Sequence, residues 1–170
     1  KDRLYKKIKE RHPELIEMVT YTSRPIRKGE TYGKEYFFVY KEEMYEMKEQ
    51  GKIIECRQYN TVLGPWFYFT ADDGQIDFST GDYLLISTLA GYEKLQGVFG
   101  MEQIVPLYIE VDDIERLERA VARERAQTTP CVPELCRRFL ADEEDFSEEK
   151  LQEAGIEIRI MNKDCEQAVE

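Results

Sequence analysis

The stretch "TYTSRPIRKGETYGKEYFFV", residues 20–39, places Arg24 and Arg27 on either side of a proline and follows them with a tyrosine-rich run. A guanidinium group offers paired donors in one plane, so two of them around a rigid turn predict a clamp for phosphate. The alternative is a solvated basic turn in which the arginines pair with Glu30 and Glu35.

Composition limits the choice of partners. With 170 residues, 42% hydrophobic, the chain fits one globular domain, and its formal net charge of −11 argues against a general binder of nucleic acid or anionic membranes. Four cysteines without C-x-x-C spacing and one histidine indicate neither zinc nor a disulfide framework. A highly charged N-terminal segment and the lack of a long apolar run predict no signal peptide, no membrane span and a cytoplasmic protein.

The first half of the chain reads as a strand-rich unit. Spacing of apolar residues and turn residues predicts, in order, a helix from Leu4 ended by Pro13, strands at 17–22 and 36–40, a helix at 41–51 stopped by Gly51, a strand at 52–59, and a hairpin turn at Gly64-Pro65 leading into an aromatic strand.

The second half reads as an α/β core with a flap. Apolar runs at 82–88 and 103–111, separated by a helical stretch, are typical of parallel strands covered on both faces. Asp112 or Asp113 can cap the next helix. A polar segment with two prolines, residues 124–134, then joins two helices into a movable flap, and a last strand follows near 156–161.

Several side chains could carry chemistry. Tyr36 and Tyr68 either complete a phosphate site or pack within aromatic strands. Glu55 either accepts two donors from a guanine edge or faces water. The flap arginines are suited to neutralise charge in phosphoryl transfer, or simply pair with neighbouring carboxylates; they are Arg123, Arg125, Arg137 and Arg138, with Glu124, Glu134 and Asp142 as the alternative partners.

The order of these features, as "SRPIRKGETYGKEYFFV", then "GKIIE", then "RRFLADEEDF", resembles the guanylate kinase family over essentially the whole chain. The resemblance implies an α/β fold of three layers, the P-loop nucleoside monophosphate kinase fold, with a parallel core sheet, a small mixed β/α GMP-binding lobe and a helical lid. It implies one domain over 1–170, divided into a core (about 1–30, 75–118 and 151–170), a lobe (31–74) and a lid (119–150).

The resemblance also implies the acceptor site. Glu55 matches the carboxylate that reads the guanine edge, and Thr20 matches a hydroxyl near the same ligand. Arg24, Arg27 and Tyr36 match the positions that bind the phosphate of GMP. If "TVLGPW" is a short insertion, Tyr68 serves the phosphate and Thr70 the guanine. Under a competing alignment, Leu63 and Gly64 take those places and the phenol is lost.

On the donor side, the resemblance implies ATP with Mg²⁺. Lys1 matches the P-loop lysine, so the chain is expected to begin inside that motif, without its glycines. Asp2 stands where a hydroxyl normally touches Mg²⁺, and Asn162 matches an ATP-binding position. Arg125, with Arg123 as the alternative, and Arg138 match the lid arginines and join Lys1 as catalytic residues.

The predicted function is therefore ATP-dependent phosphorylation of GMP to GDP by direct in-line transfer. One departure concerns the acceptor: Thr88 and Ala90 lie where the family usually has an acidic residue. This departure leaves a kinase of a different nucleoside monophosphate open. A non-catalytic module that captures a phosphorylated partner is the alternative from another class.

Overall fold

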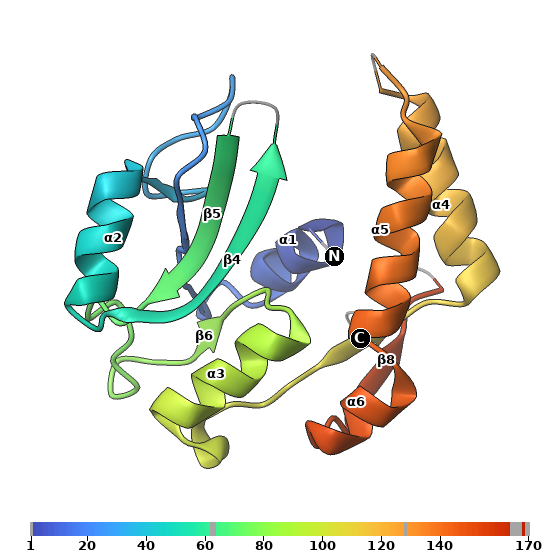
Figure 1. The fold of residues 1–170 in the computed structure, drawn as a ribbon. Coiled ribbons are helices and arrows are strands. Elements are labelled where there is room, and N and C mark those ends of the chain that lie inside the picture. The colour runs from blue at the N-terminus through green and yellow to red at the C-terminus, as the bar shows by residue number, and fades with distance from the viewer. Residues whose placement is uncertain (1, 62–63, 128, 164–167, 169–170) are drawn as a thin grey trace. The chain divides into compact units, whose positions relative to one another are not determined.

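The computed structural model describes residues 2–61, 64–127, 129–163 and 168, and it divides the chain into two compact units (Figure 1). We call Lys9–Ile104 the sheet unit, and Val105–Glu170 together with Lys1–Ile8 the helical unit. Helix α1 (Asp2–Arg11) runs across this boundary in the sequence, and it ends before Pro13 as predicted. The three-part division into core, lobe and lid remains a prediction.

A four-stranded mixed sheet forms the body of the sheet unit. Its strand order is β3-β2-β5-β4, in which β3 runs parallel to β2 while β5 is antiparallel to both β2 and β4. Figure 1 shows β4 and β5 as a long hairpin. The bounds are β2 (Tyr21–Thr22), β3 (Phe37–Phe38), β4 (Ile53–Thr61) and β5 (Gly64–Ala71).

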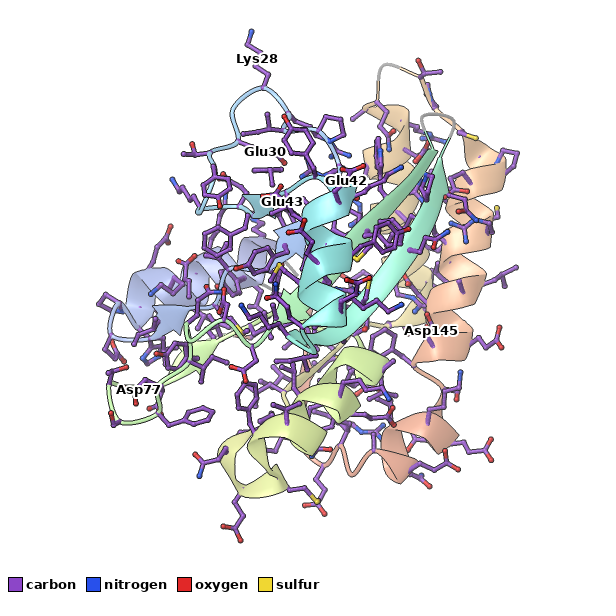
Figure 2. All side chains as sticks on the ribbon, turned by 60° about the vertical axis from the view of Figure 1, so that its left-hand side comes forward. Lys28, Glu30, Glu42, Glu43, Asp77 and Asp145 are labelled. Atoms are coloured by element: carbon purple, nitrogen blue, oxygen red, sulfur yellow. The ribbon has the colours of Figure 1, made fainter. Side chains whose placement is uncertain are left out.

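Helix α2 (Lys41–Glu49) covers one face of that sheet, and Met44 packs there on Phe67, Phe69 and Ala71. The helix begins in a capping box, in which the Glu43 side chain accepts from the backbone N–H of Tyr40 at 2.7 Å. Figure 2 shows Glu43 and its neighbour Glu42 at this end of α2.

The rest of the sheet unit holds a short parallel pair and a helix. β1 (Ile16–Glu17) pairs with β6 (Tyr83–Leu84), and α3 (Leu89–Phe99) follows, with the 3-10 turn η1 (Met101–Gln103) after it. The Thr88 hydroxyl caps α3 by accepting from Gly91 N–H. At Gly91 a Cβ atom would lie 2.4 Å from the Ser87 hydroxyl oxygen, so glycine permits a close approach there.

The helical unit contains the second parallel pair and three further helices. β7 (Tyr108–Glu110) pairs with β8 (Arg159–Met161). Asp112 caps the next helix, as predicted, and accepts from the backbone N–H groups of Ile114 and Glu115. In Figure 1, α4 and α5 lie side by side; the bounds are α4 (Asp113–Arg125), α5 (Val132–Asp145) and α6 (Glu148–Glu153).

The single strand predicted at 17–22 is wrong. Two short strands occupy this stretch and belong to different sheets, β1 and β2. The Gln75 side-chain amide replaces a strand partner between them, because its oxygen accepts from Val19 N–H at 3.2 Å and its nitrogen donates to the Val19 carbonyl at 3.0 Å. The later apolar runs do form parallel strands, but these are only two and three residues long, lie in two separate two-stranded sheets, and are partly exposed rather than covered on both faces.

The hairpin turn predicted at Gly64-Pro65 is also misplaced. Gly64 pairs with Thr61 and Pro65 with Asn60, so both residues belong to β5. The connection between β4 and β5 is residues 62–63, which lie outside the described part of the chain. The strands predicted at 36–40 and 52–59 and the helix at 41–51 are present, with Gly51 at a φ of 70° just past the helix end. Among the described residues, no helix is long and apolar enough to cross a membrane.

Candidate functional site

The four-stranded sheet carries polar side chains on the face opposite α2. Strand alternation puts Glu55 and Arg57 of β4 on this face, and the register sets them against Thr70 and Tyr68 of β5. Thr22 of β2 lies across from Tyr68 on the other side of β5. We call this the site face. Thr22 and Thr70 are buried although they are polar, whereas Tyr68 and Arg57 on the same face are partly exposed.

Glu55 is the buried carboxylate of the site face, with 8% of its surface exposed. The Thr70 hydroxyl donates to Glu55 Oε1 at 2.9 Å, and the Arg57 guanidinium donates to both carboxylate oxygens at 3.2 and 3.3 Å. Each carboxylate oxygen has two lone pairs, so the group keeps room for one further donor while Arg57 stays bound, and for more if Arg57 leaves.

A cavity of about 300 Å³ adjoins this carboxylate. Residues 53–57 of β4 form one wall, and the start of α3 forms the other. Thr88 and Ala90 line it, so the two residues that replace an acidic residue lie on the same cavity as Glu55. A cavity of this size suits a planar group such as a nucleobase.

Arg24 is the centre of a second cluster, with only 4% of its surface exposed. It donates to both oxygens of Glu30, at 2.5 and 2.7 Å, and its guanidinium lies 5.2 Å from the Tyr36 ring and 5.3 Å from the Phe38 ring. The hydrogen bond from Arg24 lowers the pKa of Glu30 to about 2. The pKa of Arg24 is raised, chiefly by Glu30 and more weakly by Tyr68.

Of the other predicted phosphate ligands, Tyr36 lies beside Arg24 and in turn contacts Tyr68. The Tyr36 and Tyr68 rings meet edge to face, 5.7 Å between centroids. Arg27 has an exposed side chain, and its backbone N–H donates to Glu30 at 2.8 Å. Lys28 follows at the tip of the loop and projects away from it (Figure 2). Thr20 is half-buried beside β2, and its carbonyl accepts from Phe37 N–H.

These two clusters lie side by side on the site face. Tyr68 and Thr70 are two residues apart on one strand, a separation of about 6.6 Å. The structure therefore brings together a carboxylate with a hydroxyl partner and, one step along the strand, a cation with two phenols. Leu63, the competing candidate, lies outside the described residues, and Gly64 is in β5 opposite Thr61.

The predicted lid arginines belong to the helical unit. Arg125 is the last residue of α4, and Arg138 lies in α5. Arg138 is 3.2 Å from Glu134 and 3.9 Å from the buried Glu124, whose carboxylate also accepts from Cys131 N–H at 2.6 Å. Glu124 thereby ties the end of α4 to the start of α5.

The predicted donor-side residues are described only in part. Lys1 lies outside the described residues, and Asp2 begins α1. Asn162 is 7% exposed, and its side-chain oxygen has no hydrogen-bond partner among the described residues. Within this same part of the chain, no cluster of three His, Cys, Asp or Glu side chains is placed to hold a metal ion.

Sequence reasoning missed two members of the site. Glu30 entered only as the partner that would make Arg24 an ordinary surface residue, whereas the pair is largely buried. Arg57 was not singled out at all. The signal was present, because a residue two positions after Glu55 on a strand must share its face.

Known proteins from one family are similar to this chain. A family model for guanylate kinase matches residues 1–66. The guanylate kinase of Nostoc sp. is 25% identical over the whole chain and 80% of its own length, and that of Synechococcus sp. is 29% identical over the whole chain and 73% of its own length. The crystal structure of guanylate kinase from Anaplasma phagocytophilum superposes with a TM-score of 0.66 at 25% identity, covering 98% of this chain and 74% of that one.

The fold and this match define the class, which is the α/β fold of the nucleoside monophosphate kinases. Within that class the chain is similar to guanylate kinases, and the predicted resemblance is confirmed.

Proposed function

We propose that this protein phosphorylates GMP to GDP with ATP as the donor. The observation that carries the proposal is the pairing of two subsites on one face of the sheet. The buried Glu55 with Thr70 suits a base that presents donors, and the cluster of Arg24, Tyr36 and Tyr68 suits a phosphate. The related proteins named guanylate kinase support the same activity.

The carboxylate of Glu55 favours guanine over adenine. Guanine presents the N1–H and the 2-amino group side by side, and these two donors match the two oxygens of one carboxylate. Adenine presents an unprotonated N1 instead, which would face a buried negative charge without a hydrogen bond. Thr70 holds the carboxylate in place through its hydroxyl donor.

The phosphate cluster is preorganised by Glu30. Holding the Arg24 guanidinium by two hydrogen bonds fixes its plane before the nucleotide arrives. Its Nε atom is buried and has no partner among the described residues, which leaves a donor for an anion. Arg27, Tyr36 and Tyr68 complete the proposed phosphate set, and we place the Thr20 hydroxyl near the same nucleotide as part of the proposal.

Transfer of the phosphoryl group then needs positioning and charge neutralisation rather than a general base, because the attacking phosphate oxygen is already anionic near neutral pH. We assign Lys1, Arg125 and Arg138 to neutralise charge on the transferring group. The unpartnered amide oxygen of Asn162 supports its assignment to ATP.

Mg²⁺ enters the proposal as part of the MgATP substrate. Asp2 is the predicted protein ligand, since Mg²⁺ prefers oxygen ligands and keeps several waters. No dedicated cage of carboxylates occurs among the residues that the structure describes, so the phosphates of ATP would supply the main ligands. We also propose a cytoplasmic location, because the cysteine pattern fits reduced thiols, and no nucleic-acid partner, because the net charge is −11.

A coupled assay of ADP release tests the activity. Full-length protein with MgATP is offered GMP, AMP, CMP, UMP and dTMP in turn, and we expect turnover with GMP to exceed the others by at least tenfold. Preference for another acceptor would favour the second candidate, a kinase of a different nucleoside monophosphate. The observation behind this candidate is that Thr88 and Ala90, rather than an acidic residue, line the cavity beside Glu55. Binding of GMP with no turnover of any acceptor would leave a binding module.

A further inference from the structure

Arg57 lies at the junction of the two subsites. It pairs across the strands with Tyr68, the phenol of the phosphate cluster, and its guanidinium bonds to Glu55, the carboxylate of the base cavity. Its side chain is 34% exposed, whereas that of Glu55 is 6% exposed. The arginine is therefore the member of this ion pair with room to move.

The charges of the phosphate cluster are incompletely matched to its ligand. A nucleoside monophosphate brings nearly two negative charges at neutral pH. The buried cation there, Arg24, is already paired with Glu30 through two hydrogen bonds. Arg27 adds one exposed guanidinium. A further cation within reach of Tyr68 would bring the site closer to neutrality, and Arg57 is on the same face, directly opposite Tyr68.

The base itself provides a reason for Arg57 to leave Glu55. When two base donors occupy the Glu55 oxygens, they replace the two donors that Arg57 supplies in the free protein. The released guanidinium remains on the site face, beside the phenol that adjoins the phosphate. An arginine is well suited to this exchange because the same planar pair of donors fits a carboxylate or a phosphate.

Building on the proposed function, we propose that Arg57 is a further substrate-binding residue. In the free protein it neutralises Glu55, and in the nucleotide complex it contacts the acceptor phosphate. The exchange links the two subsites, because a ligand with base donors and a phosphate uses both partners of the ion pair. A ligand with the base alone would only displace Arg57.

Calorimetric titration with GMP and with guanosine, which lacks the phosphate, tests this role. In Arg57→Met, we expect GMP binding to weaken by about tenfold or more, as for loss of one charge-assisted contact. Guanosine binding should stay equal or tighten, because the competitor for Glu55 has gone. Arg57→Lys should recover part of the GMP affinity.

Arg159→Met is the matched control. Arg159 is also a partly exposed strand arginine that donates to both oxygens of a glutamate, Glu148, and it lies in the helical unit. We expect it to leave both affinities unchanged. Equal weakening of GMP and guanosine in Arg57→Met, or no change in GMP binding, would overturn the inference while the proposed function stands. Failure of the wild-type protein to bind GMP would instead overturn the proposed function, and the inference with it.

Discussion

The two faces of the four-stranded sheet are built from alternate residues of the same strands, yet one face is part of the hydrophobic core and the other carries the candidate site. On the α2 face, Phe67 and Phe69 are buried by apolar packing against Met44. On the site face, Thr22 and Thr70 are buried as well, but each is held by a hydrogen bond, to the Phe67 carbonyl and to Glu55 respectively. Burial alone therefore does not distinguish the hydrophobic core from the candidate site. What distinguishes the site face is that its buried residues are polar and hydrogen-bonded.

The largest expected effect is on the α2 face. Phe69 has no exposed surface and stacks on Tyr21 with ring centroids 5.0 Å apart. Phe69→Ala should lower the free energy of unfolding by about 3–5 kcal/mol, through lost burial and the cavity left behind. Urea denaturation measures this change.

Tyr68→Phe is the comparison on the other face. It is adjacent in sequence, points the opposite way, and loses only a hydroxyl, so we expect less than about 1 kcal/mol of stability to be lost while the KM for GMP rises. A loss of stability as large as that of Phe69→Ala would show that the two faces are not divided in this way.

The elements that were predicted correctly depend on local signals. α2 is followed closely by Gly51, which has a positive φ, and α4 begins after Asp112, which caps it. The strand predicted at 17–22 failed because its interruption comes from Gln75, 56 residues away, and no local pattern reports such a contact. The same limit applies to the hairpin, whose register follows from pairing along its whole length.

The candidate site likewise has features that could be predicted from local sequence and features that depend on long-range contacts. Residue types and their order were enough to nominate Glu55, Arg24 and Tyr68. The bond between Thr70 and Glu55 depends on the β4–β5 register, and the burial of the Arg24–Glu30 pair depends on how the loop folds over Tyr36 and Phe38. Neither could be derived from spacing.

The second prediction concerns the base. Glu55→Gln replaces two acceptor oxygens by one oxygen and one donor group, so guanine loses a hydrogen bond and meets a mismatched one. We expect the KM for GMP to rise about 100-fold, of the order found when a buried polar group loses its match. IMP, which lacks the 2-amino group, should be affected less, so the preference for GMP over IMP should shrink. An unchanged preference would remove Glu55 from base recognition.

The third prediction concerns the phosphate, and its effect is smaller because Arg27 is exposed. Arg27→Ala should raise the KM for GMP by about tenfold, through loss of one charge-assisted contact, without a measurable change in stability. Lys28→Ala, one residue further along at the loop tip, removes the same charge and should have little effect (Figure 2). If both variants raised KM equally, the effect would be general electrostatic attraction and not a specific clamp.

The smallest expected effect is the change with pH in the stability that Glu30 contributes. This pH dependence should occur on the site face and not on the α2 face. The hydrogen bond from Arg24 lowers the pKa of Glu30 from 4.5 to about 2. A carboxylate with a depressed pKa stabilises the folded state fully above its unfolded pKa, and this contribution is lost as the pH falls through the folded pKa. The difference in unfolding free energy between wild type and Glu30→Gln should therefore be constant above pH 4.5 and shrink from there to about pH 2.

Phe69→Ala provides the contrast for this pH series, because the side chain it removes does not titrate. Its loss of stability should not follow the titration of Glu30, even as other carboxylates become protonated. A Glu30→Gln difference that stayed constant from pH 6 to pH 2 would mean that the Arg24–Glu30 pair does not stabilise the fold. The site face would then owe its order to the Thr22 and Thr70 hydrogen bonds, which do not depend on the Glu30 carboxylate.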